Sequence, residues 1–384
     1  MNRFVVVTLG LLAVSMAAWA WPGWDWEEGR KKTGMTKPDL QTPQAGLKDL
    51  LPLLQATPDS EPIDSVATWE AKRESIITVL ESLFGNPENL VRATNTVEEI
   101  GREDMGAYNR IHLRIPSEAD DAIPAYLLMP KQLPDHPVPA MVVLHQTQAP
   151  GKQEACGMTG DPSMAFAKEL VERGFICIAP DAVGFGERIR EGGQPYDNAM
   201  EFYAKHPTWS YFGKMNWDVS RVVDYLVSLP SVDPQRIGIM GHSHGAYGSI
   251  MASIFEPRIS LVVASCGFTT LRTDPDPNRW SHLTALLPKL GFYMDDVSTA
   301  PTDWHEIVAC IAPRPYFNWA TLEDDIFPET DNLAEVYRQL NGVYSLYGKP
   351  EAFTGKLAPG KHRFPEEARI EAYEWIERQF KVEK

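Results

Sequence analysis

The sequence predicts an α/β protein with a mainly parallel, doubly wound sheet that is covered by helices on both faces. Apolar strand-like segments alternate with helical segments through most of the chain, and this alternation is typical of such sheets. A second observation is more specific. One strand, 237–240, runs through Gly-His-Ser-His-Gly (241–245) directly into a helical segment at 246–255.

Composition restricts the classes of function. The chain has 384 residues, of which 43% are hydrophobic and 23% charged, as in a globular protein large enough for one large α/β domain or two small ones. Its formal net charge is −16 and it contains no basic block. A nucleic-acid partner is therefore not expected.

The first twenty residues have the pattern of a cleaved secretory signal. Asn2-Arg3 gives a positive start, an apolar run covers 4–16, and Ala18-Trp19-Ala20 resembles a cleavage site. The apolar run is shorter than the roughly 20 residues of a membrane span, although an uncleaved anchor is the alternative. We expect a secreted or periplasmic protein without a stable membrane anchor after cleavage. Residues 1–20 would be the signal, 21–66 an extension and 67–384 the catalytic domain.

The extension combines tryptophans with prolines. Trp21, Trp24 and Trp26 lie among acidic residues, and we expect them to pack on the parent domain rather than to stack on sugars. A short helix is expected at 46–55.

The remaining elements follow in order. An amphipathic helix at 65–84 ends at Gly85-Asn86-Pro87, and a polar turn at 117–121 joins two strands. Strands are predicted at 97–100, 109–115, 123–129, 140–144, 175–179, 237–240, 261–265, 316–320 and, more weakly marked, 352–354. Helices are predicted at 162–173, 217–229, 246–255, 330–340 and 365–380.

Two long segments, 184–216 and 267–307, interrupt the alternation. Both follow the carboxyl ends of strands, where open α/β sheets bind ligands, and loops of this length are usually functional. They are rich in aromatic and arginine residues, including Arg188 and Trp280. We expect them to form cap loops that line a substrate cleft, with Arg188, Trp280 and His145 among the residues that bind substrate.

The Gly-His-Ser-His-Gly segment predicts a nucleophile elbow, a sharp turn that exposes the hydroxyl of Ser243 above the sheet. The turn brings strand and helix so close that a Cβ at position 241 or 245 would clash. The alternative is a metal pair formed by His242 and His244. No third ligand lies nearby in the sequence, and the flanking glycines would then be unexplained.

A serine hydroxyl needs a base, and the base needs a group that orients it. Glu323, Asp324 and Asp325 follow the strand at 316–320, and a carboxylate four residues before a proline favours Asp324, with Asp325 as the alternative. His362 is the only histidine after residue 305 and is the candidate base. This order of serine, acid and histidine matches the nucleophile-elbow hydrolases.

The developing oxyanion needs donors that are already in place. The backbone N–H of His244 is one candidate, and the N–H of Gln146, or alternatively Thr147, is the other. The chain has four cysteines, Cys156, Cys177, Cys266 and Cys310, whose pairing the sequence leaves open. Cys177 and Cys266 lie in or beside apolar strands and are expected to be free thiols.

Several motifs together resemble a known family. They are Leu144-His-Gln-Thr147 with Gly151-Lys152, the segment 179–188, the elbow, Ala312-Pro-Arg-Pro315 and His362-Arg-Phe-Pro365. Over residues 67–384 the chain resembles secreted bacterial α/β-hydrolases grouped with dienelactone hydrolases and acetyl xylan esterases. The resemblance implies an α/β-hydrolase fold and ester hydrolysis through a Ser-Asp-His triad, without a metal or organic cofactor. Dienelactone hydrolases proper use a cysteine nucleophile, so Ser243 places this chain nearer the acetyl esterases.

These observations predict a serine esterase that hydrolyses carboxylic esters, with acetyl esters as the favoured class. The substrate would be a small-molecule or carbohydrate ester. A glucuronoyl-type esterase is the nearest alternative. A peptidase of the prolyl oligopeptidase type shares the triad but usually carries a large N-terminal propeller, for which this chain has too few residues. A non-catalytic binding module is the remaining alternative, and such modules typically lose a member of the triad.

Overall fold

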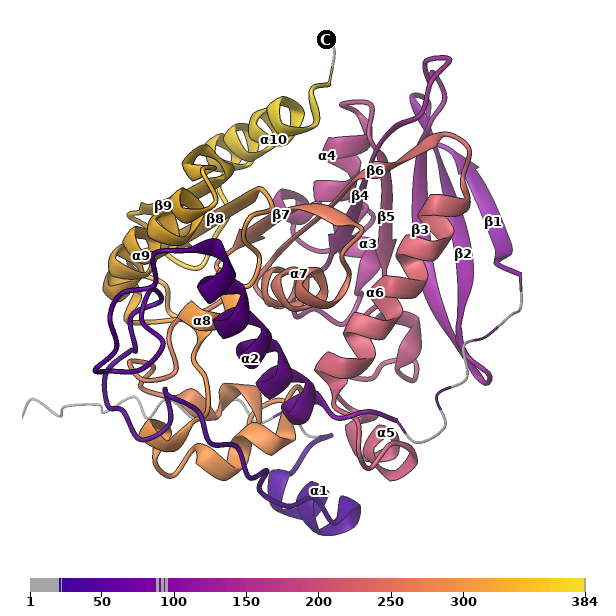
Figure 1. Ribbon diagram of the computed structural model, residues 1–384. Coiled ribbons are helices and arrows are strands. Elements are labelled where there is room, and N and C mark those ends of the chain that lie inside the picture. The colour runs from indigo at the N-terminus through magenta and orange to yellow at the C-terminus, as the bar shows by residue number, and fades with distance from the viewer. Residues whose placement is uncertain (1–20, 22, 88–89, 91–92, 94–95, 383–384) are drawn as a thin grey trace, which may run out of the picture.

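The computed structural model describes residues 21, 23–87, 90, 93 and 96–382, and its central feature is a nine-stranded sheet (Figure 1). The strand order is β1-β2-β3-β5-β4-β6-β7-β8-β9. All neighbours from β5 to β9 are parallel, whereas β1, β2, β3 and β5 pair antiparallel. The strands are β1 (Glu98–Asp104), β2 (Tyr108–Glu118), β3 (Asp121–Pro130), β4 (Val138–Leu144), β5 (Ile176–Pro180), β6 (Val232–His242), β7 (Ile259–Ser265), β8 (Tyr316–Thr321) and β9 (Phe353–Ala358). This confirms the predicted fold class.

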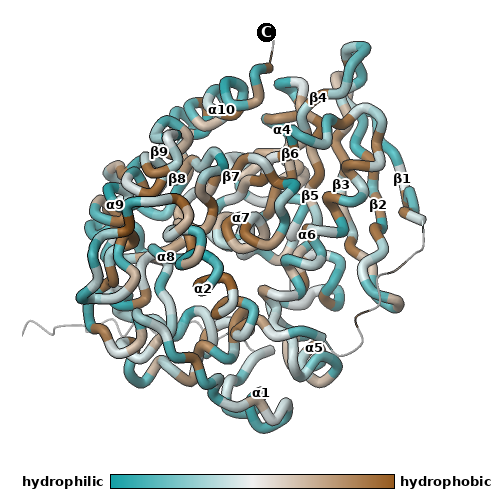
Figure 2. Tube along the Cα trace, viewed as in Figure 1, coloured by the Kyte–Doolittle hydropathy of each residue, from teal (hydrophilic) through white to brown (hydrophobic). Residues whose placement is uncertain are grey.

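Helices cover both faces of the sheet and enclose two hydrophobic cores. On β4, Ala140 and Val142 contribute to one core, while Met141 and Val143 contribute to the other, as the alternation of side chains along a strand requires. The first core includes α2 (Val66–Phe84), α6 (Tyr211–Ser228), α7 (His244–Phe255), α8 (Trp304–Ala309) and α9 (Leu333–Leu346). The second includes α4 (Phe166–Val171) and α10 (Glu366–Phe380). Figure 2 shows hydrophobic residues along the central strands and α7.

Helix α6 begins earlier than predicted. The side chain of Ser210 caps it by accepting a hydrogen bond from the N–H of Gly213, and serine is a strongly preferred cap residue. The first long segment is therefore shorter than the sequence indicated. It also contains α5 (Ala199–Lys205).

The N-terminal extension packs against the second long segment (Figure 1). A helix that was not predicted, α1 (Trp26–Thr33), brings the indole N–H of Trp26 to the carbonyl of Pro288 at 2.8 Å. The indole N–H of Trp24 donates to the carbonyl of Ser281 at 2.7 Å. Both indoles are buried, so the expectation that these tryptophans pack on the parent domain is confirmed.

The prediction of a short helix at 46–55 is wrong. The structure has turns there, and the chain makes its hydrogen bonds to other segments instead. The N–H of Leu51 donates to the side chain of Gln44, and the carbonyl of Leu51 accepts from Nε2 of His305. These tertiary contacts outweigh a local helical propensity that Pro52 already weakens.

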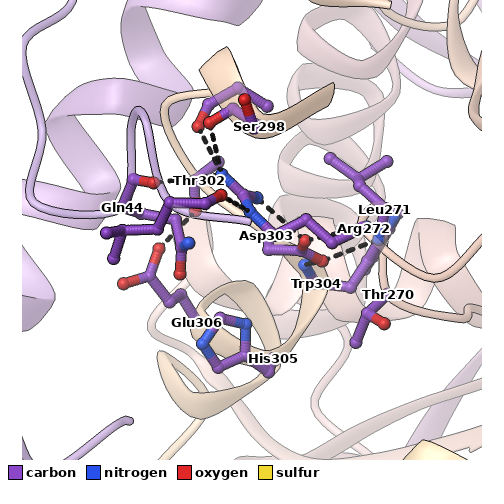
Figure 3. Close-up of polar contacts among 12 residues, drawn as sticks. Gln44, Thr270, Leu271, Arg272, Ser298, Thr302, Asp303, Trp304, His305 and Glu306 are labelled. Carbon is purple, nitrogen blue, oxygen red and sulfur yellow. Dashed lines mark hydrogen bonds and ion pairs between the residues drawn. The ribbon is translucent and has the colours of Figure 1, made fainter. Parts of the chain in front are cut away.

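Arg272 lies at the centre of the contact between the extension and the second segment (Figure 3). Its guanidinium pairs with the carboxylate of Asp303 at 3.0 Å and donates to the carbonyls of Gln44, Leu47, Ser298 and Ala300. Asp303 also accepts from the backbone N–H groups of Leu271 and Trp304. Arg272 and Asp303 are almost entirely buried, so this network fastens the extension to the cap segment with fully satisfied charges.

All four cysteines are buried and free, which confirms the expectation for Cys177 and Cys266.

In the part of the chain that the structure describes, none of the helices has both the length and the apolar character needed to cross a bilayer. The predicted signal at 1–20 lies outside the described residues.

Candidate active site

The elbow joins β6 to α7 as the sequence predicts. Ser243 occupies the turn with φ 53° and ψ −116°, a region that non-glycine residues rarely adopt. Its N–H donates to the carbonyl of Ser265 at the end of β7, at 2.9 Å. Strain of this kind persists only where the surrounding structure enforces it, and here the enforcing elements are β6, β7 and α7.

The two flanking glycines are required by space. A Cβ at Gly241 would lie 2.3 Å from the backbone carbon of Gly245, and a Cβ at Gly245 would lie 2.1 Å from the carbonyl oxygen of Leu144. Both distances are far shorter than van der Waals contact. The clash expected from the sequence is therefore present at both positions, and it is with backbone, which cannot rotate away.

Asp324 and His362 meet above the carboxyl ends of the strands. The Nδ1 atom of His362 lies 2.8 and 2.9 Å from the two carboxylate oxygens of Asp324. Oδ1 of Asp324 also accepts hydrogen bonds from the backbone N–H groups of Ile326 and Phe327, at 2.9 and 2.8 Å. The carboxylate is almost completely buried, whereas the imidazole is 13% exposed. This arrangement fixes the imidazole with Nδ1 on the carboxylate.

The neighbouring acids lie elsewhere. Glu323 and Asp325 are both exposed, and neither has a described contact with His362. Among the three candidates, the structure thus brings Asp324 to the histidine.

The ring of His242 also lies beside His362, at 4.7 Å between ring centroids, and its Nδ1 contacts the hydroxyl of Ser265. The ring of His244 has other neighbours, because it stacks on His145 at 5.6 Å and contacts Phe185 at 4.6 Å. The two rings therefore do not converge, as a metal pair would require.

The loop after β4 holds Gln146 and Thr147, the two alternatives for the second oxyanion donor, whereas His244 begins α7. His145 fixes the start of this loop, because its Nδ1 contacts the carbonyl of Gln146 at 2.7 Å and its Nε2 accepts from the N–H of Ala182. The side chain of Gln146 donates to the carboxylate of Glu154 at 3.1 Å, so only its backbone N–H is left for the predicted oxyanion role. With both ring nitrogens occupied, His145 supports the loop, and its predicted contact with substrate has no free nitrogen to use.

A buried ion pair anchors the far end of the same loop. The carboxylate of Asp181, directly after β5, accepts from Nζ and from the backbone N–H of Lys152 at 2.6 and 2.8 Å. Both side chains are essentially inaccessible. A Cβ at Gly151 or Gly186 would lie within 2.2 Å of this carboxylate, so glycine is required at both positions. The sequence contained these residues, but nothing in it indicated that they form a pair.

Burial lowers the pKa of three histidines around the elbow. The pKa values of His242 and His244 are lowered well below the usual range, first by burial and then by the neighbouring imidazoles of His362 and His145 respectively. The pKa of His145 is lowered by burial as well, although the carboxylate of Asp181 opposes the shift. These three histidines are neutral near pH 7.

Three aromatic side chains from different segments pack beside the site, one after β8, one on a cap loop and one on α7. Phe327 lies 5.8 Å from the ring of His362 and stacks on Trp280, which in turn contacts Tyr247 on α7. Trp280 is 2% exposed, and Phe327 and Tyr247 are 3% and 5% exposed, so Trp280, which was predicted to bind substrate, is a buried packing residue. The sequence did not single out Phe327 or Tyr247, although their positions just after the acid and the nucleophile were a usable signal.

Arg188 lies in a different part of the cap. Its guanidinium makes ion pairs of 2.6 Å with Asp121 and Asp218, and it lines a polar cavity of about 430 Å³ beside the start of β3. Ser243, Asp324 and His362 are not among the residues that line this cavity. The structure thus does not bring Arg188 together with the triad.

Comparison with known families decides the relationship. The family model described as "Glucuronyl esterase, fungi" matches residues 117–348, which is more than half of the chain. The chain belongs to the glucuronyl esterase family. It is therefore a hydrolase of ester bonds with an α/β-hydrolase fold, as the sequence motifs imply, while the finer grouping with dienelactone hydrolases stays a prediction.

Individual relatives show how distant the similarity is. A protein of Bacillus subtilis described as "Putative hydrolase YtaP" is 27% identical over 238 residues, which cover 60% of this chain and 74% of that protein. A 4-O-methyl-glucuronoyl methylesterase of Schizophyllum commune is 21% identical over 325 residues, covering 76% and 72% of the two chains. The solved glucuronoyl esterase from Solibacter usitatus superposes with a TM-score of 0.68 at 16% identity, covering 86% of this chain and 97% of that one. This last similarity establishes the fold.

Proposed function

We propose that this glucuronyl esterase family member is a serine esterase in which Ser243 is the nucleophile, His362 the base and Asp324 the group that orients the base. The observation that carries the proposal is the contact of the buried Asp324 carboxylate with Nδ1 of His362 at 2.8 Å, with the ring of His362 beside His242, the residue that precedes the strained Ser243. With Nδ1 protonated toward the carboxylate, Nε2 is free to accept the serine proton. The acid prediction for Asp324 is thus supported by geometry.

The reaction then follows the acyl-enzyme route. Ser243 attacks the ester carbonyl, its proton passes to Nε2 of His362, and the imidazolium returns that proton to the leaving alcohol. The backbone N–H groups of His244 and Gln146 are the proposed oxyanion donors, each worth roughly 10²–10³ in rate. Water, deprotonated by His362, releases the acid and restores the serine.

The substrate class we propose is an ester of a carbohydrate. The related proteins from Schizophyllum commune and Solibacter usitatus are described as glucuronoyl esterases. In a glucuronoyl ester the sugar supplies the acyl group, whereas in an acetylated polysaccharide the sugar supplies the alcohol. The family relationship favours the first arrangement over the acetyl esters that the sequence motifs suggested.

The test combines a substrate panel with a nucleophile variant. We expect wild-type protein to hydrolyse benzyl glucuronate faster than acetylated xylan or 4-nitrophenyl acetate. Ser243→Ala should lower kcat by about 10⁶ and abolish labelling by a fluorophosphonate probe. Ser253→Ala, which removes a buried hydroxyl lower on α7, is the matched control and should remain active. An active, unlabelled Ser243→Ala would overturn the mechanism, and a preference for acetyl esters would overturn the substrate class alone.

We also propose that the protein is exported. The support is the pattern at residues 1–20, which lies outside the described residues. Expression with the full N-terminus in a bacterial host should give an extracytoplasmic protein whose first residue is Trp21. A cytoplasmic product that retains Met1 would contradict this proposal.

A further inference from the structure

Cys266 lies directly behind the acid and base of the site, in a position that the proposed reaction does not use. It follows β7 in a left-handed conformation with φ 48°, and its N–H donates to the carbonyl of Trp319 on β8 at 2.7 Å. The thiol donates to the carbonyl of Arg363, the residue after the catalytic histidine, at 3.6 Å. The backbone thus holds the sulfur between the strand that precedes Asp324 and the loop that carries His362.

This position completes a cluster of three metal-ligating groups. Sγ of Cys266, a carboxylate oxygen of Asp324 and Nδ1 of His362 all lie within 4.8 Å of one another. Zinc ligands lie about 2.0–2.3 Å from the ion, so in a tetrahedral site they are about 3–4 Å apart. To close on an ion, the sulfur therefore moves toward the other two ligand atoms by roughly 1–2 Å at most, while Nδ1 and the carboxylate oxygen, now 2.8 Å apart, separate slightly.

The ligand types select the ion. Thiolate, imidazole and carboxylate together suit zinc, whereas magnesium and calcium prefer all-oxygen sites. Three protein ligands leave the fourth tetrahedral position for water. The imidazole is the most exposed of the three side chains, so the ion would enter from the side of His362.

We propose that Cys266, Asp324 and His362 form an inhibitory binding site for Zn²⁺. The proposal rests on the proposed function for its effect on activity, because the ion uses the acid and the base of the reaction. On binding, the thiol releases its proton to solvent and the sulfur coordinates the ion. Coordination of Nδ1 moves the imidazole proton to Nε2, the atom that must be free of a proton to activate Ser243. Zinc binding and ester hydrolysis therefore exclude each other.

Zinc titration of the esterase tests the proposal. Wild-type activity should fall with one zinc ion per chain and return when EDTA is added. Loss of one ligand should raise the half-inhibiting zinc concentration at least about tenfold. We expect this shift in Cys266→Ala and Cys266→Ser, each compared with its own activity without zinc. Cys310→Ala removes a buried thiol outside the cluster and should be inhibited like wild type.

A spectroscopic measurement separates metal binding from catalysis. Co²⁺ added to the whole protein should give a sulfur-to-cobalt charge-transfer band in the near ultraviolet, saturating at one ion per chain. The band should be absent in both Cys266 variants and present in Cys310→Ala and in the inactive Ser243→Ala. Equal zinc inhibition of wild type and the Cys266 variants, no inhibition at millimolar zinc, or no cobalt–sulfur band would each overturn the proposal. A band in a protein without esterase activity would support the site while refuting the proposed function.

Discussion

Replacing Asp324 by asparagine tests the proposed triad at its most constrained contact. Oδ1 of Asp324 accepts from the N–H groups of Ile326 and Phe327, so the amide oxygen of the introduced asparagine must take this position. The opposite orientation would set an NH₂ group against two backbone donors. The amide nitrogen therefore takes the place of Oδ2, which is the oxygen nearer to Nδ1 of His362, at 2.8 Å against 2.9 Å for Oδ1. As a donor at this position it favours the tautomer in which Nδ1 accepts. The imidazole proton then resides on Nε2, where it blocks the reaction with Ser243.

The expected loss in kcat is up to about 10⁴, as in a triad where the same change was made, which corresponds to about 5 kcal/mol of transition-state stabilisation. The substrate should bind nearly as before, so KM should change little. Asp325→Asn is the matched control, because Asp325 is adjacent and exposed, and it should retain activity within about twofold. Steady-state kinetics on a chromogenic ester, with circular dichroism to check folding, measures both. Activity above a tenth of wild type in a folded Asp324→Asn protein would refute this reasoning.

Three further predictions concern stability. Gly245→Ala should destabilise the fold by about 3 kcal/mol or more, because the new Cβ meets the carbonyl of Leu144 at 2.1 Å. Gly101→Ala is the control, since its new Cβ has no atom within 4 Å. The thermal unfolding midpoints of the two variants measure the difference. The three buried histidines around the elbow have lowered folded-state pKa values, so the unfolded chain takes up protons first as the pH falls. Their contribution to the free energy of unfolding is complete above the unfolded pKa of about 6.5 and is lost below it at up to roughly 4 kcal/mol per pH unit for the three together. Urea unfolding between pH 7.5 and 5 should show this loss. A free energy of unfolding that stays constant over this range would contradict their buried, neutral state. Arg272→Lys should lower the free energy of unfolding by at least about 3 kcal/mol, because one ammonium does not replace the planar guanidinium in a buried network. Arg338→Lys is the control and should change it little, since the side chain of Arg338 is 73% exposed. Equal unfolding midpoints for the two variants would show that the network contributes nothing.

The parts of the site that the sequence predicts are those in which local chemistry restricts the residue type. Glycine at 241 and 245 follows from the backbone contact of strand and helix, and this marks Ser243. Asp324 is recognisable because a strand end places it, and His362 because no other histidine follows residue 305. In each of these cases a few neighbouring residues contain the information.

What the sequence does not predict depends on pairs that are distant in the chain. Lys152 and Asp181 are 29 residues apart, and either alone resembles a surface charge. Arg188 resembled a substrate residue until its partners Asp121 and Asp218 were known. The turns at 46–55 replace a helix because their hydrogen-bonding groups find partners such as His305, some 250 residues later. No local pattern contains such partners.

The network around Arg272 has a consequence for the order in which the chain folds. Residues 44–55 are synthesised early, yet the groups that receive them, from Arg272 to Glu306, are synthesised more than 200 residues later. Contacts so distant in sequence form slowly, because a long loop must close before they contribute. In the interval the carbonyls of Gln44 and Leu47 lack the guanidinium of Arg272, and the ammonium of Lys72 lacks the carboxylate of Glu306. The segment that fastens the cap is thus synthesised well before the residues that bind it, and its docking holds in place the segment that carries Trp280.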